Sequence, residues 1–179
     1  GLEYSVIDPE NGRRLAPGEQ GEILVRGYSI MKGYYNNPAE TAEAIDADGW
    51  LHTGDTGLIR PDGHLRFIGR FKDLLKVGGE NVSPAEVEAF LLTMAEVDQV
   101  AVVGYPDARL AEIPVAFIVP VDGTGPDQGA VAAHCKGNIA SYKIPRHVLC
   151  VAELPMTPTG KVQKHKLRAR AIEDLGAPN

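Results

Sequence analysis

The sequence predicts an α+β fold in two parts: a small β-rich subdomain, followed by a compact α+β unit. In the first part, short strand-like runs at residues 3–7 and 21–26 are separated by turn-forming residues. In the second part the coarse order is helix, strand, strand, helix, strand, which suits helices that cover a small sheet. With 44% hydrophobic and 23% charged residues, the chain of 179 residues has the composition of a globular protein with a buried core.

The β-rich part continues through a short helix into a hairpin. We expect the helix over residues 39–45 and the hairpin over residues 57–68, where a Pro-Asp-Gly sequence forms the turn. Between these elements, Tyr34, Tyr35 and Trp50 are expected to pack as scaffold residues.

The second part begins with a clear helix start. Ser83 can accept a hydrogen bond from the first-turn amides, Pro84 has the φ that suits the first helical position, and Glu86 completes a capping box. We therefore predict a helix over residues 84–93. Strands over 99–105 and 113–121, a helix over 127–140 and a strand over 148–152 follow. A short terminal helix is expected to carry Lys164, Lys166, Arg168 and Arg170.

Composition excludes several kinds of function. A net charge of -6 and a pI near 5.4 argue against nucleic acid as a partner, although local basic clusters can still hold the phosphates of a nucleotide. No apolar run is long enough for a membrane span, and no signal peptide is recognisable. Cys135 and Cys150 lack CxxC spacing and are expected to be reduced, partly buried thiols of a cytoplasmic protein. The five histidines show no metal-binding spacing, so we expect no protein-ligated metal.

The connector over residues 69–84, GRFKDLLKVGGENVSP, concentrates charge and flexibility. Arg70, Lys72 and Lys76 add positive charge just before Gly78 and Gly79, whose backbone can adopt positive φ and admit a ligand closely. Both an anion-handling loop and a plain glycine turn beside a solvated basic strand fit these residues.

Two further stretches place a charged side chain next to a glycine. In HTGD, residues 52–55, Asp55 follows a glycine turn and can accept two hydrogen bonds from the vicinal hydroxyls of a ribose. The same four residues also suit an ordinary tight turn. Near the C-terminal end, the turn over residues 157–160 presents Lys161, a compact and steerable positive charge.

Four stretches, taken in this order and at these separations, resemble a known family. HTGD, the connector over residues 69–84, SYKIPR over 141–146 and PMTPTGKVQK over 155–164 resemble the carboxyl-terminal part of the AMP-forming acyl-CoA synthetases. Their superfamily also holds luciferases and peptide-synthetase adenylation domains. The resemblance covers essentially the whole chain. It implies that residues 1–69 are the last subdomain of a large N-terminal domain and that residues 70–179 form a mobile AMP-binding lid.

The resemblance also implies roles for the nucleotide-side residues. Asp55 would hold the ribose diol, and Arg70 would meet the same ribose or its phosphate. Lys72 stands at the position of the family's hinge residue, where backbone rotation is needed and side-chain chemistry is permissive. Lys76 would reach the nucleotide in one orientation of the lid.

The remaining roles concern the two chemical steps. Gly78 and Gly79 match the loop that meets the pantetheine arm of CoA. Lys161 matches the catalytic lysine, which would lie between the carboxylate oxygen and the α-phosphate and offset their repulsion. Ala111 departs from the family's usual glycine, which puts the loop geometry beside Glu112 in question.

The resemblance implies an ATP-dependent carboxylic acid–CoA ligase that first forms an acyl adenylate and then a thioester with CoA. Its substrates would be a carboxylic acid, ATP and CoA, with Mg²⁺ accompanying ATP on a ligand outside this chain. The family's phosphate loop lies in an upstream N-terminal domain, so we expect the chain alone to be inactive. An adenylation domain, a luciferase-like enzyme and a non-enzymatic nucleotide-binding or interaction module remain as alternatives.

Overall fold

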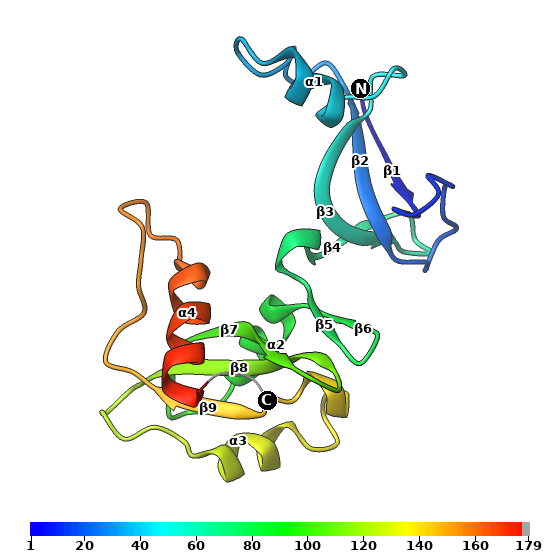
Figure 1. Ribbon diagram of the computed structural model, residues 1–179. Coiled ribbons are helices and arrows are strands. Elements are labelled where there is room, and N and C mark those ends of the chain that lie inside the picture. Colours follow the sequence, from blue (N-terminus) through cyan, green and yellow to red (C-terminus); the bar gives the residue numbers. More distant parts are fainter. Residues whose placement is uncertain (177–179) are drawn as a thin grey trace. The chain divides into compact units, whose positions relative to one another are not determined.

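The computed structural model describes residues 1–176, and these divide into two compact units, Gly1–Asp73 and the residues from Leu74 onward (Figure 1). The packing boundary follows Asp73, whereas the sequence analysis placed the domain boundary after residue 69. The first unit is built around a sheet, and the second combines a sheet with helices, so the predicted α+β class is confirmed.

The first unit is a four-stranded antiparallel sheet in which neighbours in space are also neighbours in sequence, in the order β1-β2-β3-β4. Each strand pairs with the strand that precedes or follows it in the chain, so the sheet is a meander. A helix interrupts it between the second and third strands. The elements are β1 (Leu2–Ile7), β2 (Gly21–Gly27), α1 (Pro38–Ala44), β3 (Leu51–Ile59), β4 (Leu65–Arg70) and the 3₁₀ turn η1 (Phe71–Asp73).

The core of the first unit is small. Trp50 is buried and clusters with Ile7 and Leu24, and the guanidinium of Arg26 lies 4.5 Å from the Trp50 ring centroid. The scaffold role predicted for Trp50 is confirmed.

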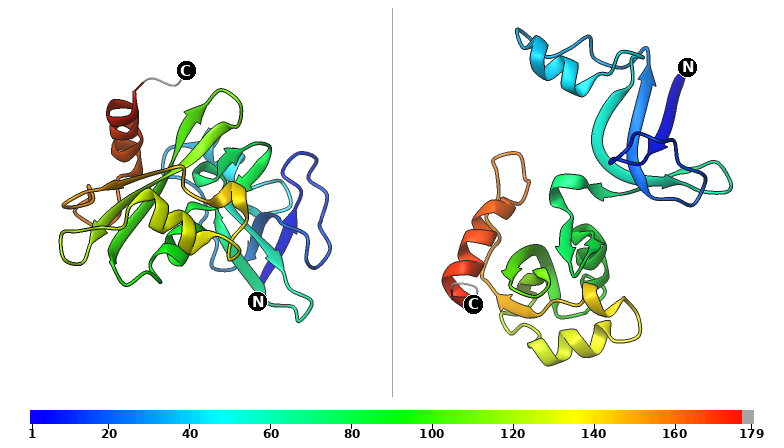
Figure 2. Two further views of the ribbon diagram at one scale, coloured as in Figure 1. Left: turned by 90° about the horizontal axis from the view of Figure 1, so that it is seen from below. Right: turned by 45° about the vertical axis from the view of Figure 1, so that its right-hand side comes forward.

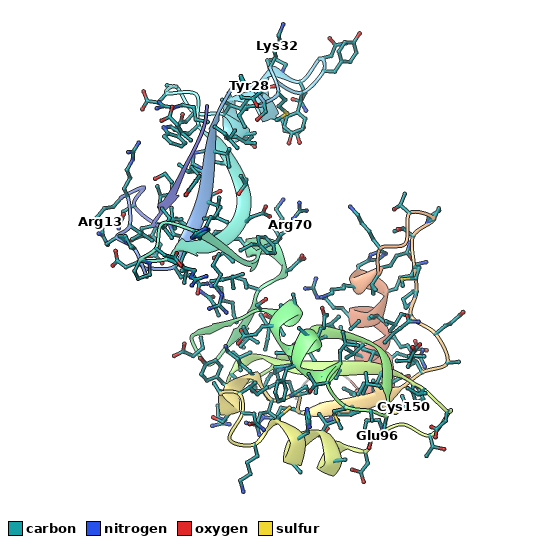
Figure 3. All side chains as sticks on the ribbon, turned by 180° about the vertical axis from the view of Figure 1, so that it is seen from behind. Arg13, Tyr28, Lys32, Arg70, Glu96 and Cys150 are labelled. Atoms are coloured by element: carbon teal, nitrogen blue, oxygen red, sulfur yellow. The ribbon has the colours of Figure 1, made fainter. Side chains whose placement is uncertain are left out.

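The same prediction is wrong for the two tyrosines. Tyr34 is 44% exposed and Tyr35 93% exposed, because the loop that carries them extends toward α1 without cover from the sheet. Figure 2 shows the ribbon of this extension, and Figure 3 labels Tyr28 and Lys32 on it.

The second unit is a five-stranded sheet with the order β6-β5-β8-β7, in which β9 pairs in parallel with β8 and the other pairs are antiparallel. The long hairpin β7–β8 forms its centre. The elements are β5 (Leu75–Val77), β6 (Glu80–Val82), α2 (Pro84–Leu91), β7 (Val97–Asp107), β8 (Ala111–Pro120), α3 (Gln128–Cys135), the 3₁₀ turn η2 (Ser141–Lys143), β9 (His147–Cys150) and α4 (Lys164–Leu175).

Helices cover both faces of this sheet. Along β8, Val115 and Phe117 join one hydrophobic cluster, whereas Ala116 and Ile118 join the other, as the two-residue period of a strand requires. The helices α2 and α3 contribute to the first face through residues such as Val87 and Val131, and α4 covers the second face through Leu167 and Ala171 (Figure 1). The unit is therefore a helix–sheet–helix sandwich.

The start of α2 is where the sequence predicts it, but its capping differs. Pro84 is the first helical residue and Ser83 occupies the N-cap, yet the Ser83 side chain does not make the cap hydrogen bond. The carboxylate of Glu86 accepts two hydrogen bonds from Lys143 Nζ, at 2.6 and 2.8 Å. The predicted capping box is thus wrong, because a long-range ion pair takes the carboxylate that would have completed it.

Two other expectations are corrected in the second unit. The helix predicted over residues 127–140 ends at Cys135, shortly before Gly137 adopts a φ of +82° that no helix continues. Both cysteines are free thiols, but only Cys135 is buried, and this burial raises the pKa of its thiol. Cys150 is exposed, so the prediction of partial burial is wrong for it.

Among residues 1–176, no helix has the length and apolar character needed to cross a membrane.

Candidate functional site

The HTGD sequence lies inside a strand. On β2 a single residue, Ile23, stands opposite residues 53–55 of β3, and regular pairing resumes on both sides. The prediction of a tight turn is therefore wrong: the segment is a bulge in a continuous ladder. Gly54 adopts a φ of +66°, and Thr53 Oγ1 both donates to the Ile23 carbonyl at 2.6 Å and accepts from the Asp55 amide at 3.0 Å.

Glu22 braces this bulge from the neighbouring strand. Its Oε1 accepts a hydrogen bond from the Gly54 amide at 3.2 Å, and its Oε2 lies 3.1 Å from His52 Nδ1. Only 14% of the Glu22 side chain is exposed. The sequence analysis missed this residue, which directly precedes the apolar run Ile23-Leu24-Val25 of β2.

A separate irregularity, one extra residue of β4 at Ile68, places Asp55 opposite Arg70. Arg70, labelled in Figure 3, is the last residue of β4. Arg70 Nε donates to Asp55 Oδ1 at 3.1 Å, and the two side chains are 68% and 28% exposed. A carboxylate has about four lone-pair sites, and the hydrogen bond from Arg70 uses one of those on Asp55. The carboxylate thus keeps acceptor capacity for a hydroxyl ligand, and the guanidinium keeps donors for an anion.

Lys72 follows in the 3₁₀ turn η1, shortly before the boundary between the two units. Its side chain is exposed. A residue at this place can change its backbone angles without disturbing a packed core.

Gly78 and Gly79 form the two-residue turn of the hairpin β5–β6, in which Val77 pairs with Glu80. Their φ angles are +60° and +89°, as the favoured hairpin turns demand. The Gly78 amide donates to the Leu110 carbonyl at 2.8 Å, and no atom lies within 4 Å of a Cβ built on Gly79. A ligand can therefore approach the Gly79 backbone closely.

Lys76 lies on β5 next to this turn. Its amide donates to Glu112 Oε2 at 2.8 Å, and its ammonium donates to Asn81 Oδ1, across the hairpin. Glu112 lies directly over Gly104, where an added Cβ would stand 2.3 Å from Glu112 Oε1. The preceding residue, Ala111, adopts a φ of +66°, so it takes the left-handed conformation that favours glycine. Glu112 is thus a structural partner of Lys76 that the sequence analysis did not identify.

Lys161 lies on the loop that precedes α4 (orange in Figure 2), and hydrogen bonds close this loop at its base. Met156 and Val162 form a bridge at the base of the loop, and Gly160 turns the chain with a φ of +79°. Thr157 Oγ1 accepts from the Lys161 amide at 3.0 Å, and the Thr157 amide donates to the Lys161 carbonyl at 2.8 Å. The backbone of Lys161 is fixed on both sides while its side chain is exposed.

The structure thus joins some of the predicted residues and separates others. Asp55 and Arg70 are direct partners in the first unit. Lys76, Gly78 and Gly79 share one hairpin of the second unit, and Lys161 lies on a different loop of that unit. Among residues 1–176, no three side chains of His, Cys, Asp or Glu lie close enough together to hold a metal ion.

Two family models match the chain. The model described as AMP-binding enzyme C-terminal domain matches residues 86–161, and the model described as AMP-binding enzyme matches residues 1–35.

Curated relatives and solved structures extend the similarity. The chain is 42% identical over 174 residues to the medium-chain acyl-CoA ligase ACSF2 of Danio rerio, covering 97% of this chain and 29% of the relative. It is 41% identical over 173 residues to 4-coumarate–CoA ligase 1 of Arabidopsis thaliana, covering 97% and 31%. The crystal structure of ATP-bound MatB from Rhodopseudomonas palustris superposes with a TM-score of 0.86 at 37% identity, covering 96% of this chain and 34% of that one. The chain spans about a third of the length of the relatives it matches.

Proposed function

Because this chain belongs to the AMP-binding enzymes of the adenylate-forming superfamily, as their carboxyl-terminal part, we propose that it serves an ATP-dependent ligase that joins a carboxylic acid to CoA. In the first step, a carboxylate oxygen attacks the α-phosphorus of ATP and pyrophosphate leaves. In the second, the CoA thiol loses its proton and attacks the acyl carbon, and AMP leaves. The relatives' names, which include acyl-CoA and 4-coumarate–CoA ligases, support this reaction class.

The observation that carries the proposal is the presentation of Lys161. Its backbone is held by Thr157 and its ammonium is exposed, so a positive charge is offered at a fixed position. Bringing a carboxylate to a triphosphate opposes two negative charges, and a lysine between them stabilises the charge that develops at the bridging oxygen. We assign the adenylation step to this residue.

Asp55 and Arg70 suit the nucleotide. The unoccupied acceptor capacity of Asp55 matches the two hydroxyls of a ribose, and the largely exposed Arg70 has N–H groups left for a phosphate. Their mutual hydrogen bond fixes both side chains before the nucleotide arrives, which lowers the entropic cost of binding.

The glycine hairpin suits the second step. The open backbone at Gly79 admits the narrow pantetheine arm of CoA, and Lys76 beside it adds a charge for the nucleotide. Lys161 and this hairpin lie on different elements of the second unit, so we propose that the two steps use two orientations of that unit, exchanged by rotation near Lys72.

The exposed apolar residues of the first unit support an upstream partner domain. Within the first unit only a few apolar side chains are buried, whereas eight large hydrophobic residues are exposed there: Leu2, Tyr4, Tyr28, Met31, Tyr34, Tyr35, Leu65 and Phe67. Four of them, Tyr28, Met31, Tyr34 and Tyr35, share one loop, and exposed apolar residues that gather in this way mark interaction sites. We propose that the remaining, N-terminal portion of an AMP-binding enzyme covers them and supplies the phosphate loop and the ligand for Mg²⁺.

The test is pyrophosphate release with ATP, CoA and a panel of short, long and aromatic carboxylic acids. We expect no release by the chain alone and acid-dependent release when the N-terminal portion of the same enzyme is added. Release that needs no acid, or silence of the complete protein toward every acid together with tight AMP binding, would favour a nucleotide-binding module instead. The acid that gives the highest kcat/KM identifies the substrate class.

A further inference from the structure

One glutamate of α2 reaches around an edge of the sheet to the helix on the other face. Glu88 Oε1 lies 2.6 Å from Lys164 Nζ, and the two side chains are only 18% and 25% exposed. The same oxygen accepts a hydrogen bond from the Val102 amide at 2.7 Å. Because α2 and α4 cover opposite faces of the sheet, this ion pair ties two layers together.

The edge position of β7 explains how Glu88 can do this. Among residues 1–176, β8 is the only strand that pairs with β7, so every second amide of β7 points away from the sheet and needs another acceptor. Val102 is fully buried, and Glu88 provides that acceptor. Its carboxylate is thereby held at the edge, where Lys164 meets it.

The positive charge of Lys164 is unfavourable for the helix in which it lies. It is the first residue of α4, and a cation in the first turn of a helix opposes the helix dipole. A carboxylate at hydrogen-bond distance compensates this charge. The start of α4 is therefore held in place by Glu88, and it lies three residues after Lys161.

The loop that carries Lys161 closes directly onto this anchored point. The Gln163 amide donates to the Pro155 carbonyl at 2.7 Å, which joins the two stems of the loop next to Lys164. A displaced Lys164 would release this closure and, with it, the Lys161 backbone. A loss of positioning by even a small distance lowers the rate of a reaction that depends on a fixed charge.

We propose that Glu88 is a positioning residue that acts through Lys164 to fix the loop presenting Lys161. This inference rests on the proposed function only for the role of Lys161, because the anchoring itself is a property of the chain. Glu88 does not touch the reacting atoms.

The same helix provides a matched control. Glu86, two residues earlier on α2, pairs with Lys143 Nζ at the same 2.6 Å distance but ties α2 to η2 instead of the Lys161 loop. Glu86→Gln removes a comparable carboxylate from the same helix. Glu88→Gln preserves an acceptor oxygen for Val102, so the variant keeps the buried hydrogen bond while losing the charge.

The first experiment measures amide hydrogen exchange in the loop, at Lys161 and Gln163, for the wild-type chain and four variants. We expect Glu88→Gln and Lys164→Met each to raise these exchange rates about tenfold, and the double variant to raise them no further. Glu86→Gln should leave them unchanged. Unchanged rates in Glu88→Gln, or an equal rise in Glu86→Gln, would overturn the anchoring role.

The second experiment uses the complete enzyme. Glu88→Gln should lower the rate of adenylation about tenfold while thioester formation from supplied acyl adenylate stays unchanged, and Lys164→Arg should keep most of the adenylation rate. Equal losses in both steps would overturn the positioning role. If the exchange rates change as expected but Lys161→Ala leaves adenylation intact, the anchor stands and the proposed function of Lys161 fails.

Discussion

Arg70 lies directly opposite Asp55 in the β3–β4 ladder, and its Nε donates a hydrogen bond to Asp55 Oδ1 at 3.1 Å. The pair depends on a one-residue bulge in β4: Thr56 pairs with Gly69 and Gly57 with Phe67, so Ile68 is an extra residue of β4 between these pairs. A regular ladder continued from the Gly57–Phe67 pair would place Gly69 opposite Asp55, and the one-residue shift brings Arg70 to that position instead. The bulge is therefore the structural origin of the nucleotide site that we propose.

Asp55→Ala should weaken AMP binding by the complete enzyme about tenfold to a hundredfold, because hydrogen bonds to a charged acceptor contribute about 1.5–3 kcal/mol. Isothermal titration calorimetry measures this directly. Asp62→Ala is the matched control, since Asp62 pairs with Arg60 at 2.9 Å near the turn of the same hairpin. Equal affinities of the two variants would remove Asp55 from the site.

Glu22→Ala should lower the free energy of unfolding by about 1–3 kcal/mol, because the Gly54 amide would lose its charged acceptor and His52 its partner. Urea denaturation followed by Trp50 fluorescence reports on this unit. The exposed pair of Glu3 with Arg26 serves as comparison, and we expect Glu3→Ala to change the stability by less than about 1 kcal/mol. If both variants unfold alike, Glu22 does not brace the bulge.

Ala111→Gly should raise the free energy of unfolding by up to about 1 kcal/mol, since a non-glycine residue at a φ of +66° is strained. Ala108 lies in the same turn without a positive φ, so Ala108→Gly should lower the stability instead. Thermal unfolding of both variants decides the question. Stabilisation by neither substitution would mean that the strain at Ala111 is relieved elsewhere.

Asp107 gives this turn a pH dependence. Hydrogen bonds from the Leu110 and Arg109 amides lower the pKa of the Asp107 carboxyl below its usual range. A carboxylate with a lowered pKa contributes stability above its unfolded pKa, near pH 4, and this contribution is lost as the pH falls through the folded value. The stability difference between wild type and Asp107→Ala should thus be constant from pH 5 to 7 and shrink below about pH 4. A difference that grows on acidification would contradict this assignment.

Local signals predicted much of the fold. Pro84 marked the first residue of α2, and the glycine pair at 78 and 79 matched a turn whose two φ angles are positive. These features depend on nearest neighbours in the chain, so a sequence pattern can specify them.

The residues that brace the candidate site escaped prediction because their partners are distant in sequence. Glu22 meets His52 thirty residues later, and Glu88 meets Lys164 seventy-six residues later. For Glu86, the local sequence predicted a capping role, but its carboxylate pairs instead with Lys143, which is distant in sequence. Propensity and spacing describe the immediate chain, whereas these carboxylates are placed by the packing of whole elements.

The most direct test of the account is a comparison of the two half-reactions in Lys161→Ala of the complete enzyme. We predict that acid-dependent pyrophosphate release falls at least about a hundredfold, since removal of one charge-stabilising group costs about 3 kcal/mol or more. Thioester formation from supplied acyl adenylate and CoA should stay near the wild-type rate, and Lys166→Ala, which removes an exposed lysine from α4, should change neither rate. Equal losses in both half-reactions, or an unchanged rate of pyrophosphate release, would contradict the assignment of adenylation to Lys161.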